Sequence, residues 1–235
     1  MSSGPLIFVG ILFTLASSFW GLILLPQLQL GRGQPVLLAA TGDLYPAARP
    51  GMAQRGAQVY RANGCVECHT QQVRPRESGS DLDRPGWGQR RTVAQDYLRD
   101  YPVQLGSLRI GPDLTNIGAR QTNATWHLTH LYNAKLTSPG SMMPPYAYLF
   151  TKHTLKPGQM RSEDSLPVDG APDVEVLPTE DARALAAYLL SLKSEVPLFE
   201  APLPRSATNA TLAEAAGTNQ AAITSSPATA TLPPK

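Results

Sequence analysis

The chain has 235 residues, a formal net charge of +2 and an ordinary hydrophobic content of 42%. This length allows one or two domains, and the near balance of acids and bases gives no indication of nucleic-acid binding. The 22 prolines favour long irregular connections over a continuous helical bundle.

An uncharged run of apolar residues lies near the N-terminus, from Leu6 to Leu25. Twenty residues at about 1.5 Å each span about 30 Å, the thickness of the hydrocarbon core of a bilayer. Residues 1–26 are therefore expected to form one transmembrane anchor, with Trp20 near the membrane surface. A cleaved signal peptide is the alternative. It would need a basic start and a shorter apolar core, although residues 39–41 resemble a cleavage site.

Changes in composition divide the rest of the chain. Residues 27–50 contain Gly and Pro with little charge and are predicted to be a linker, and residues 51–198 a folded domain. Within this domain, residues 152–178 hold four prolines and several acids, a pattern interpreted as a loop insertion. The last part of residues 199–235 is rich in Ala, Thr, Ser and Pro, so this tail is predicted to be disordered.

Helical periodicity is clearest at the two ends of the domain. A first helix is predicted over residues 52–62, where Gly56 lies on the apolar face, and it ends at Gly64. A last helix is predicted from the N-cap Thr179 up to Pro197, with an apolar stripe that contains Tyr188. Two further stretches have helical patterns: Thr92–Tyr101 and Thr125–Leu136. The fold class is therefore predicted to be mainly α.

The two cysteines of the chain stand in Cys65-Val66-Glu67-Cys68-His69, a C-x-x-C-H pattern. This pattern is typical of covalent attachment of a haem c, in which both thiols bind the haem vinyl groups and the histidine binds the iron. Zinc would need a second pair of Cys or His ligands at suitable spacing. A thioredoxin-like motif would need a βαβ setting. The sequence therefore predicts one covalent haem held by Cys65 and Cys68, with His69 as a metal ligand.

A second axial ligand is expected, because a c-type haem that transfers electrons is usually bound by His and Met. Met142 and Met143 lie in the segment Ser141-Met-Met-Pro-Pro-Tyr146. Met143 directly precedes a proline, which restricts the backbone before it. Met143 is therefore predicted to be the ligand, with Met142 as the alternative.

The segment Arg109-Ile-Gly-Pro-Asp-Leu114 is similar to the Gly-Pro-x-Leu segment of class I cytochromes c. Class I cytochromes c also pack a first helix with a bare glycine, here Gly56, across a last helix with an aromatic residue. The resemblance therefore implies a single N-terminal transmembrane helix followed by a class I cytochrome c domain. In that family the proline carbonyl accepts a hydrogen bond from the histidine ligand, a role that the resemblance assigns to Pro112. Haem propionates are commonly held by Arg or Trp donors. Arg109 is the first candidate and Trp126 the second. His127 and His130 are interpreted as polar contacts to a propionate or to another subunit.

Four motifs in one order give a closer resemblance. They are Gly64-Cys-Val-Glu-Cys-His-Thr-Gln-Gln-Val-Arg-Pro75, Gly106-Ser-Leu-Arg-Ile-Gly-Pro-Asp-Leu114, Trp126-His-Leu-Thr-His130 and Ser141-Met-Met-Pro-Pro-Tyr146. Together they resemble subunit II of cbb3-type cytochrome c oxidases, the membrane-anchored mono-haem subunit. The segment Arg84-Pro-Gly-Trp-Gly-Gln89 departs from the usual pattern of that family.

The resemblance implies an electron-transfer subunit that has no catalytic residues of its own. Its partners would be the haem-copper catalytic subunit, a further cytochrome c subunit or donor, and membrane lipid. The haem domain would lie on the periplasmic side of the bacterial cell membrane. Three alternatives remain: a mono-haem subunit of a nitric-oxide reductase, a haem enzyme such as a peroxidase, and a free electron shuttle.

Overall fold

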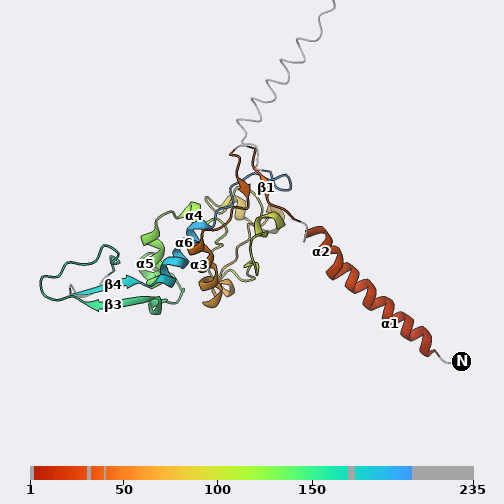
Figure 1. The fold of residues 1–235 in the computed structure, drawn as a ribbon, viewed down its shortest axis with the longest axis horizontal. Coiled ribbons are helices and arrows are strands. Elements are labelled where there is room, and N and C mark those ends of the chain that lie inside the picture. The colour runs from red at the N-terminus through yellow and green to blue at the C-terminus, as the bar shows by residue number, and fades with distance from the viewer. Residues whose placement is uncertain (1–2, 31–32, 40, 169–172, 203–235) are drawn as a thin grey trace, which may run out of the picture.

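A long apolar helix projects from a folded domain in the computed structural model, which is about 43% helical and describes residues 3–30, 33–39, 41–168 and 173–202 (Figure 1). The helix consists of α1 (Gly4–Phe19), a π-helical turn η1 (Trp20–Leu24) and α2 (Leu25–Leu30). Its apolar stretch Gly4–Gln29 has 26 residues, none of them buried against the domain in its most apolar window. At about 1.5 Å per residue it is about 39 Å long, which is enough to cross a membrane.

The segment after this helix is folded onto the domain, which differs from the simple linker expected for residues 27–50. It forms the hairpin of β1 (Val36–Leu37) and β2 (Leu44–Tyr45). The amide of Gln95 donates to the carbonyl oxygens of Gln34 (2.9 Å) and Tyr45 (3.1 Å). The guanidinium of Arg99 donates to the carbonyl of Pro46 at 2.7 Å, and Arg49 pairs with Asp100.

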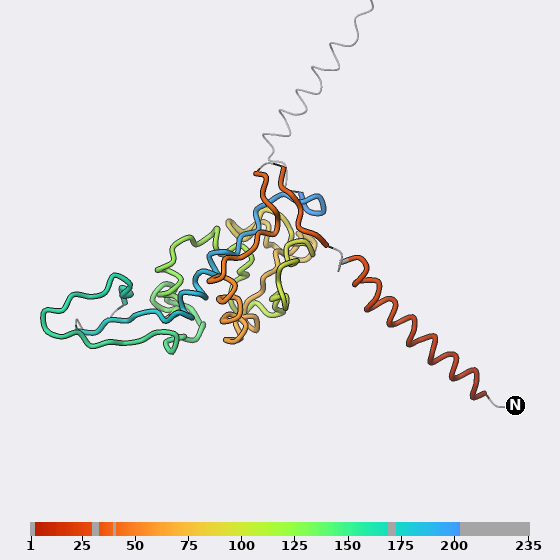
Figure 2. Tube along the Cα trace, viewed as in Figure 1, coloured from red at the N-terminus to blue at the C-terminus, as the bar shows by residue number. Residues whose placement is uncertain are grey.

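A buried group of polar side chains, here called the clamp, joins this segment to the C-terminal part of the domain. Arg90 is only 2% exposed. It pairs with Asp96 at 2.6 Å and donates to the carbonyl of Val196, while the Tyr45 hydroxyl donates to Asp96. Figure 2 shows the C-terminal segment beside the hairpin of β1 and β2 that follows the apolar helix. Tyr45, Val93 and Leu198 pack into a small apolar cluster at the same place.

The main core is built where the first and last helices of the domain cross. The first helix, α3 (Gly51–Ala62), begins one residue before the predicted start. It packs against α6 (Glu180–Ser191), which is capped by Thr179 as predicted but ends six residues before Pro197. A Cβ on Gly56 would overlap the carbonyl of Ala184 and come within 2.7 Å of Tyr188 Cβ. The bare glycine therefore allows the close crossing that the sequence predicted.

Shorter elements fill the space between these two helices. A helix predicted at Thr125–Leu136 is present as α5 (Ala124–Tyr132), followed by one 3₁₀ turn. Thr92–Tyr101, also predicted to be helical, contains only a single 3₁₀ turn. The side chains of Tyr97 and Gln95 bond to the backbone carbonyls of Gln71 and Tyr45. The remaining short helices are α4 (Ile117–Arg120), η2 (Cys65–Glu67), η3 (Arg76–Ser78), η4 (Asp81–Asp83), η5 (Ala94–Tyr97), η6 (Ala134–Leu136) and η7 (Ala147–Leu149).

The loop insertion predicted at residues 152–178 is instead a projecting β-hairpin. Strand β3 (Phe150–Thr154) pairs antiparallel with β4 (Val174–Pro178), and the hairpin extends away from the apolar helix (Figure 1). Leu166 folds back onto it by donating its backbone N–H to the carbonyl of Val176 at 2.9 Å. The sequence shows little alternation of apolar and polar residues here, because β3 is exposed along most of its length. The predicted disordered tail lies outside the described residues from position 203 onward.

Candidate functional site

The C-x-x-C-H motif folds as one tight turn directly after α3. Gly64 has a left-handed backbone (φ = +65°), which ends α3 and starts the 3₁₀ turn η2. The backbone N–H groups of Cys68 and His69 both donate to the carbonyl of Cys65, at 3.2 and 3.0 Å. In a 3₁₀ turn, side chains three residues apart lie on the same side. The fold therefore presents the thiols of Cys65 and Cys68 together, with His69 immediately beyond.

The imidazole of His69 is oriented by the segment that contains Pro112. Its Nδ1 lies 2.7 Å from the carbonyl oxygen of Pro112. A carbonyl only accepts hydrogen bonds, so Nδ1 carries the proton and Nε2 keeps a free lone pair. Burial lowers the pKa of His69, although the bond to Pro112 acts in the opposite direction. A Cβ on Gly111 would overlap this ring, so glycine is required beside it.

A buried carboxylate joins the two segments around His69. Asp113 is 1% exposed and accepts from the Thr70 hydroxyl at 2.6 Å and from the backbone N–H of Gln72 at 2.8 Å. The backbone N–H of Gly111 also donates to the carbonyl of Cys68 at 2.9 Å. These bonds hold the Pro112 carbonyl in place, since they fix residues on both sides of it.

Arg109, the first sequence candidate for a propionate contact, is held by the protein itself. Its guanidinium makes bonds of 2.6 and 2.8 Å to Asp81, 2.7 Å to the Thr70 hydroxyl and 2.6 Å to the carbonyl of Gln72. These bonds engage all three guanidinium nitrogens. The structure therefore gives Arg109 a different partner from the one expected, because Asp81 lies buried beside it.

A second arginine near His69 lacks such a partner, and the sequence reasoning missed it. Arg120 donates through Nη2 to the carbonyl of Asp113 at 2.9 Å, but its buried Nη1 has no hydrogen-bond partner among the described residues. Burial lowers the pKa of Arg120, and its charge lowers the pKa of His69. Its guanidinium lies 5.4 Å from the ring centre of Trp87. An unsatisfied cation beside the histidine fits an anionic group of a cofactor.

Helix α5 places three ring side chains near the motif. Trp126 stacks on His130, with ring centres 4.7 Å apart and planes 11° apart. Burial, together with repulsion from His127 and His69, lowers the pKa of His130 to about 4. His130 is therefore neutral at pH 7, and its Nδ1 bonds to the Thr137 hydroxyl at 2.5 Å. His127 is buried on the carbonyl of Gln121, a contact internal to the domain.

The two neighbouring methionines, Met142 and Met143, differ in how far they are buried. Met142 is 81% exposed, whereas Met143 is partly buried and packs against the main core beside Tyr146. The backbone N–H of Tyr146 donates to the carbonyl of Leu131 at 2.9 Å, which ties this loop to α5. Tyr146 also lies beside Cys65, since each shifts the pKa of the other. The structure therefore places Met143, rather than Met142, on the core side of the loop.

The chemistry of these donors fits a haem better than the alternatives. Burial raises the pKa of Cys65 to about 11, so this thiol is neutral at pH 7 and is no activated nucleophile. Within the described ranges, no three His, Cys, Asp or Glu residues come together as a metal site. The pair of thiols, the oriented His69 and the unpaired Arg120 match the vinyl groups, iron and propionates of one haem.

Comparison with known proteins agrees with this pattern. Residues 46–168, just over half of the chain, match the family model described as cytochrome c oxidase, mono-heme subunit/FixO. No curated protein matches the chain significantly. The matched range contains the C-x-x-C-H turn, the Pro112 segment, α5 and the Met143 loop. The chain belongs to the family of mono-haem subunits of cytochrome c oxidase.

Proposed function

We propose that this chain is a membrane-anchored c-type cytochrome that passes single electrons to the haem-copper catalytic subunit of a cbb3-type oxidase. The family match supports a mono-haem subunit with partner oxidase subunits. The apolar helix Gly4–Gln29 supports the anchor. The haem domain would lie outside the cytoplasm, where covalent c-type attachment takes place in bacteria.

The hydrogen bond between His69 and Pro112 is the observation that carries this proposal. It leaves Nε2 as the one ring nitrogen available to bind iron, and it increases the basicity of that nitrogen. A haem bound by His on one side and Met on the other accepts and releases one electron without an open position for oxygen. Cys65 and Cys68 would hold it covalently, Met143 would be the second ligand, and Arg120 and Trp126 would face its propionates.

Covalent attachment is tested by the mass of the isolated chain. Each thiol adds across one vinyl C=C bond, the sulfur to one carbon and the hydrogen to the other, so no atom is lost. The mature protein should weigh the polypeptide plus one complete haem, and haem stain should follow the band after denaturation. A Cys65→Ser, Cys68→Ser double variant should lose the stain. Stain that survives in this variant would contradict the attachment.

The second ligand is tested by the two neighbouring methionines. Met143→Ala should abolish the near-infrared band of sulfur-to-iron ligation and let the ferrous haem bind carbon monoxide, because an iron position opens. Met142→Ala is the matched control, since this side chain is exposed, and should keep the band. Rapid carbon-monoxide binding by the unmutated chain would contradict the proposal and favour a haem enzyme such as a peroxidase.

A further inference from the structure

An exposed row of large apolar side chains lies in the loop that leads to Pro112. Single exposed apolar residues are ordinary, but a cluster of them marks an interaction site. In this loop the buried residue is the polar Gln104, and the apolar side chains on either side of it face solvent. This reverses the usual distribution of side chains. The row, here called the apolar strip, has side chains 38% to 100% exposed and consists of Tyr101, Val103, Leu105, Leu108 and Ile110.

The apolar strip is fixed directly onto the backbone of the haem motif. The backbone N–H of Gln71 donates to the carbonyl of Leu105 at 2.8 Å. A Cβ on Gly106, which has φ = +67°, would overlap the carbonyl of His69 and lie 2.9 Å from that of Val66. The backbone of this loop at Leu105 and Gly106 therefore lies directly against the C-x-x-C-H turn, and anything that binds the strip lies close to the proposed haem.

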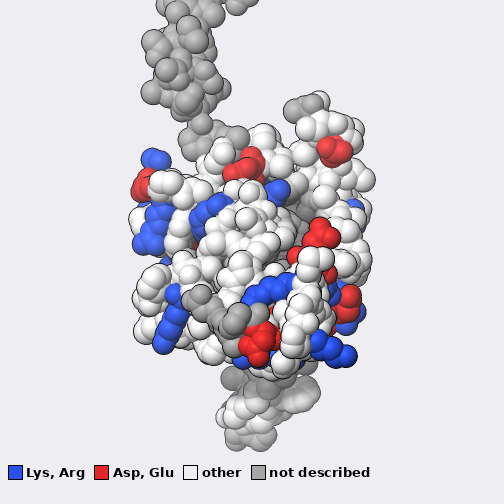
Figure 3. All heavy atoms as spheres, turned by 90° about the vertical axis from the view of Figure 1, so that its left-hand side faces the viewer, with Lys and Arg blue, Asp and Glu red and all other residues white. Residues whose placement is uncertain are grey.

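The strip carries no charge. Residues 101–108 contain no Asp, Glu, Lys or Arg, and Arg109 is neutralised by its pair with Asp81. The face of the domain around the projecting hairpin instead shows acidic and basic side chains interspersed (Figure 3). Charged surfaces steer partners that come and go, whereas permanent interfaces bury uncharged apolar area. The strip therefore fits a permanent partner rather than a diffusing electron donor.

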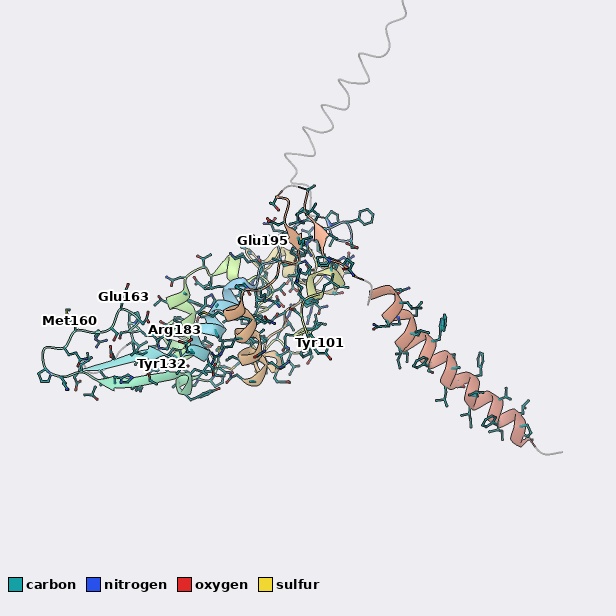
Figure 4. The ribbon with its side chains drawn as sticks, viewed as in Figure 1. Tyr101, Tyr132, Met160, Glu163, Arg183 and Glu195 are labelled. Carbon is teal, nitrogen blue, oxygen red and sulfur yellow. The ribbon has the colours of Figure 1, made fainter. Side chains whose placement is uncertain are left out.

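The first residue of the strip lies on the side of the domain toward the apolar helix. Tyr101 is at the edge of the domain that faces the apolar helix (Figure 4). The two residues just before it, Arg99 and Asp100, bond to Pro46 and Arg49 of the segment that comes from the anchor. A partner subunit within the same membrane would meet this edge first.

We propose that the apolar strip docks on an uncharged extramembrane surface of the haem-copper partner subunit, and that electrons leave the haem across this contact. This inference rests on the proposed function and adds the contact surface to it. The experiment uses the full chain in its purified oxidase complex, with Val103→Asp and Leu108→Asp tested one at a time. Met160→Asp is the matched control, because Met160 is 88% exposed at the far hairpin.

A carboxylate placed in a desolvated interface should slow electron transfer from this haem to the partner by about tenfold or more, or release the chain in detergent. The haem spectrum of each variant should remain unchanged, and Met160→Asp should behave as the unmutated complex. Unchanged transfer and assembly in both variants would overturn the docking surface. Slower reduction by an external donor, with internal transfer intact, would assign the strip to that donor instead.

Two further outcomes are distinguishable. If the unmutated complex transfers no electron from this haem to the partner, the proposed function itself fails. If it transfers normally and the variants do too, only the strip proposal fails.

Discussion

The clamp and the haem motif are both built around buried arginines, yet they are completed in different ways. In the clamp, Arg90 has protein partners for its charge and for all three of its guanidinium nitrogens. Beside the motif, Arg120 keeps a buried nitrogen that has no partner in the part of the chain that the structure describes. A buried cation is tolerated when it is paired and costly when it is not. The comparison indicates that the polypeptide alone completes the clamp, whereas the motif region needs a further group.

The largest effect is expected from removing Arg90. In the variant Arg90→Met, the carboxylate of Asp96 stays buried without its partner, so the free energy of unfolding should fall by about 3–5 kcal/mol. Chemical denaturation of the haem-loaded protein measures this change. Arg91→Met is the control, since Arg91 is exposed, and should cost about 0.5 kcal/mol or less. Equal stability of the two variants would mean that the clamp contributes little.

Arg120→Gln should distinguish the haem-free and haem-loaded forms. Without haem, the variant removes an unsatisfied donor, and the free energy of unfolding should stay within about 1 kcal/mol of the parent. With haem, the loss of a charge-assisted bond to a propionate should cost about 1.5–3 kcal/mol. The midpoint potential should also decrease, since a positive charge near the iron disfavours the ferric state. Equal losses in both forms would argue against a propionate contact.

Gly111→Ala tests how closely the backbone approaches His69. The added methyl group would overlap the imidazole, so overpacking should cost about 1–3 kcal/mol and disturb the ligand bond. The spectrum of the ferric haem and a denaturation curve both report this change. Gly140→Ala is the control, because no atom lies within 4 Å of its added Cβ. A spectrum that is unchanged in Gly111→Ala would show that the ring can move aside.

A further effect depends on pH. The pKa of His130 falls from 6.5 in the unfolded chain to about 4 in the folded one. Between these values the unfolded chain binds more protons, so stability should be full above pH 6.5 and decrease as the pH falls toward 4. His130→Gln should flatten this part of the stability profile of the haem-loaded protein. An unchanged slope would assign the dependence to other groups.

The sequence predicted the parts of the fold that depend on local patterns. The C-x-x-C-H motif and the cap at Thr179 follow from residue types at fixed spacing, and the crossing at Gly56 follows from the resemblance to class I cytochromes c. The clamp could not be predicted, because it joins Tyr45, Arg90 and Val196, which lie far apart in the chain. The hairpin at residues 150–178 was missed because its first strand is exposed and shows no alternation.

At the candidate site too, local motifs could be predicted from sequence, whereas contacts between distant residues could not. The hydrogen bond between His69 and Pro112 was expected from a short motif and is present in the structure. The roles of Arg109 and Arg120 could not be separated from sequence, since both are arginines near the same segment. Only the position of Asp81, 28 residues before Arg109, decides which of them is paired. The ligand roles of His69 and Met143 remain predictions for the experiments above.

The folded segment after the apolar helix also sets how far the domain can travel from that helix. Helix α2 ends at Leu30 and the first backbone atom bonded to the domain belongs to Gln34. Even fully extended, four residues span only about 14 Å. A domain on so short a tether stays at a high effective concentration beside any subunit that binds the anchor. Its contact with that subunit can therefore be individually weak and still be occupied nearly all the time.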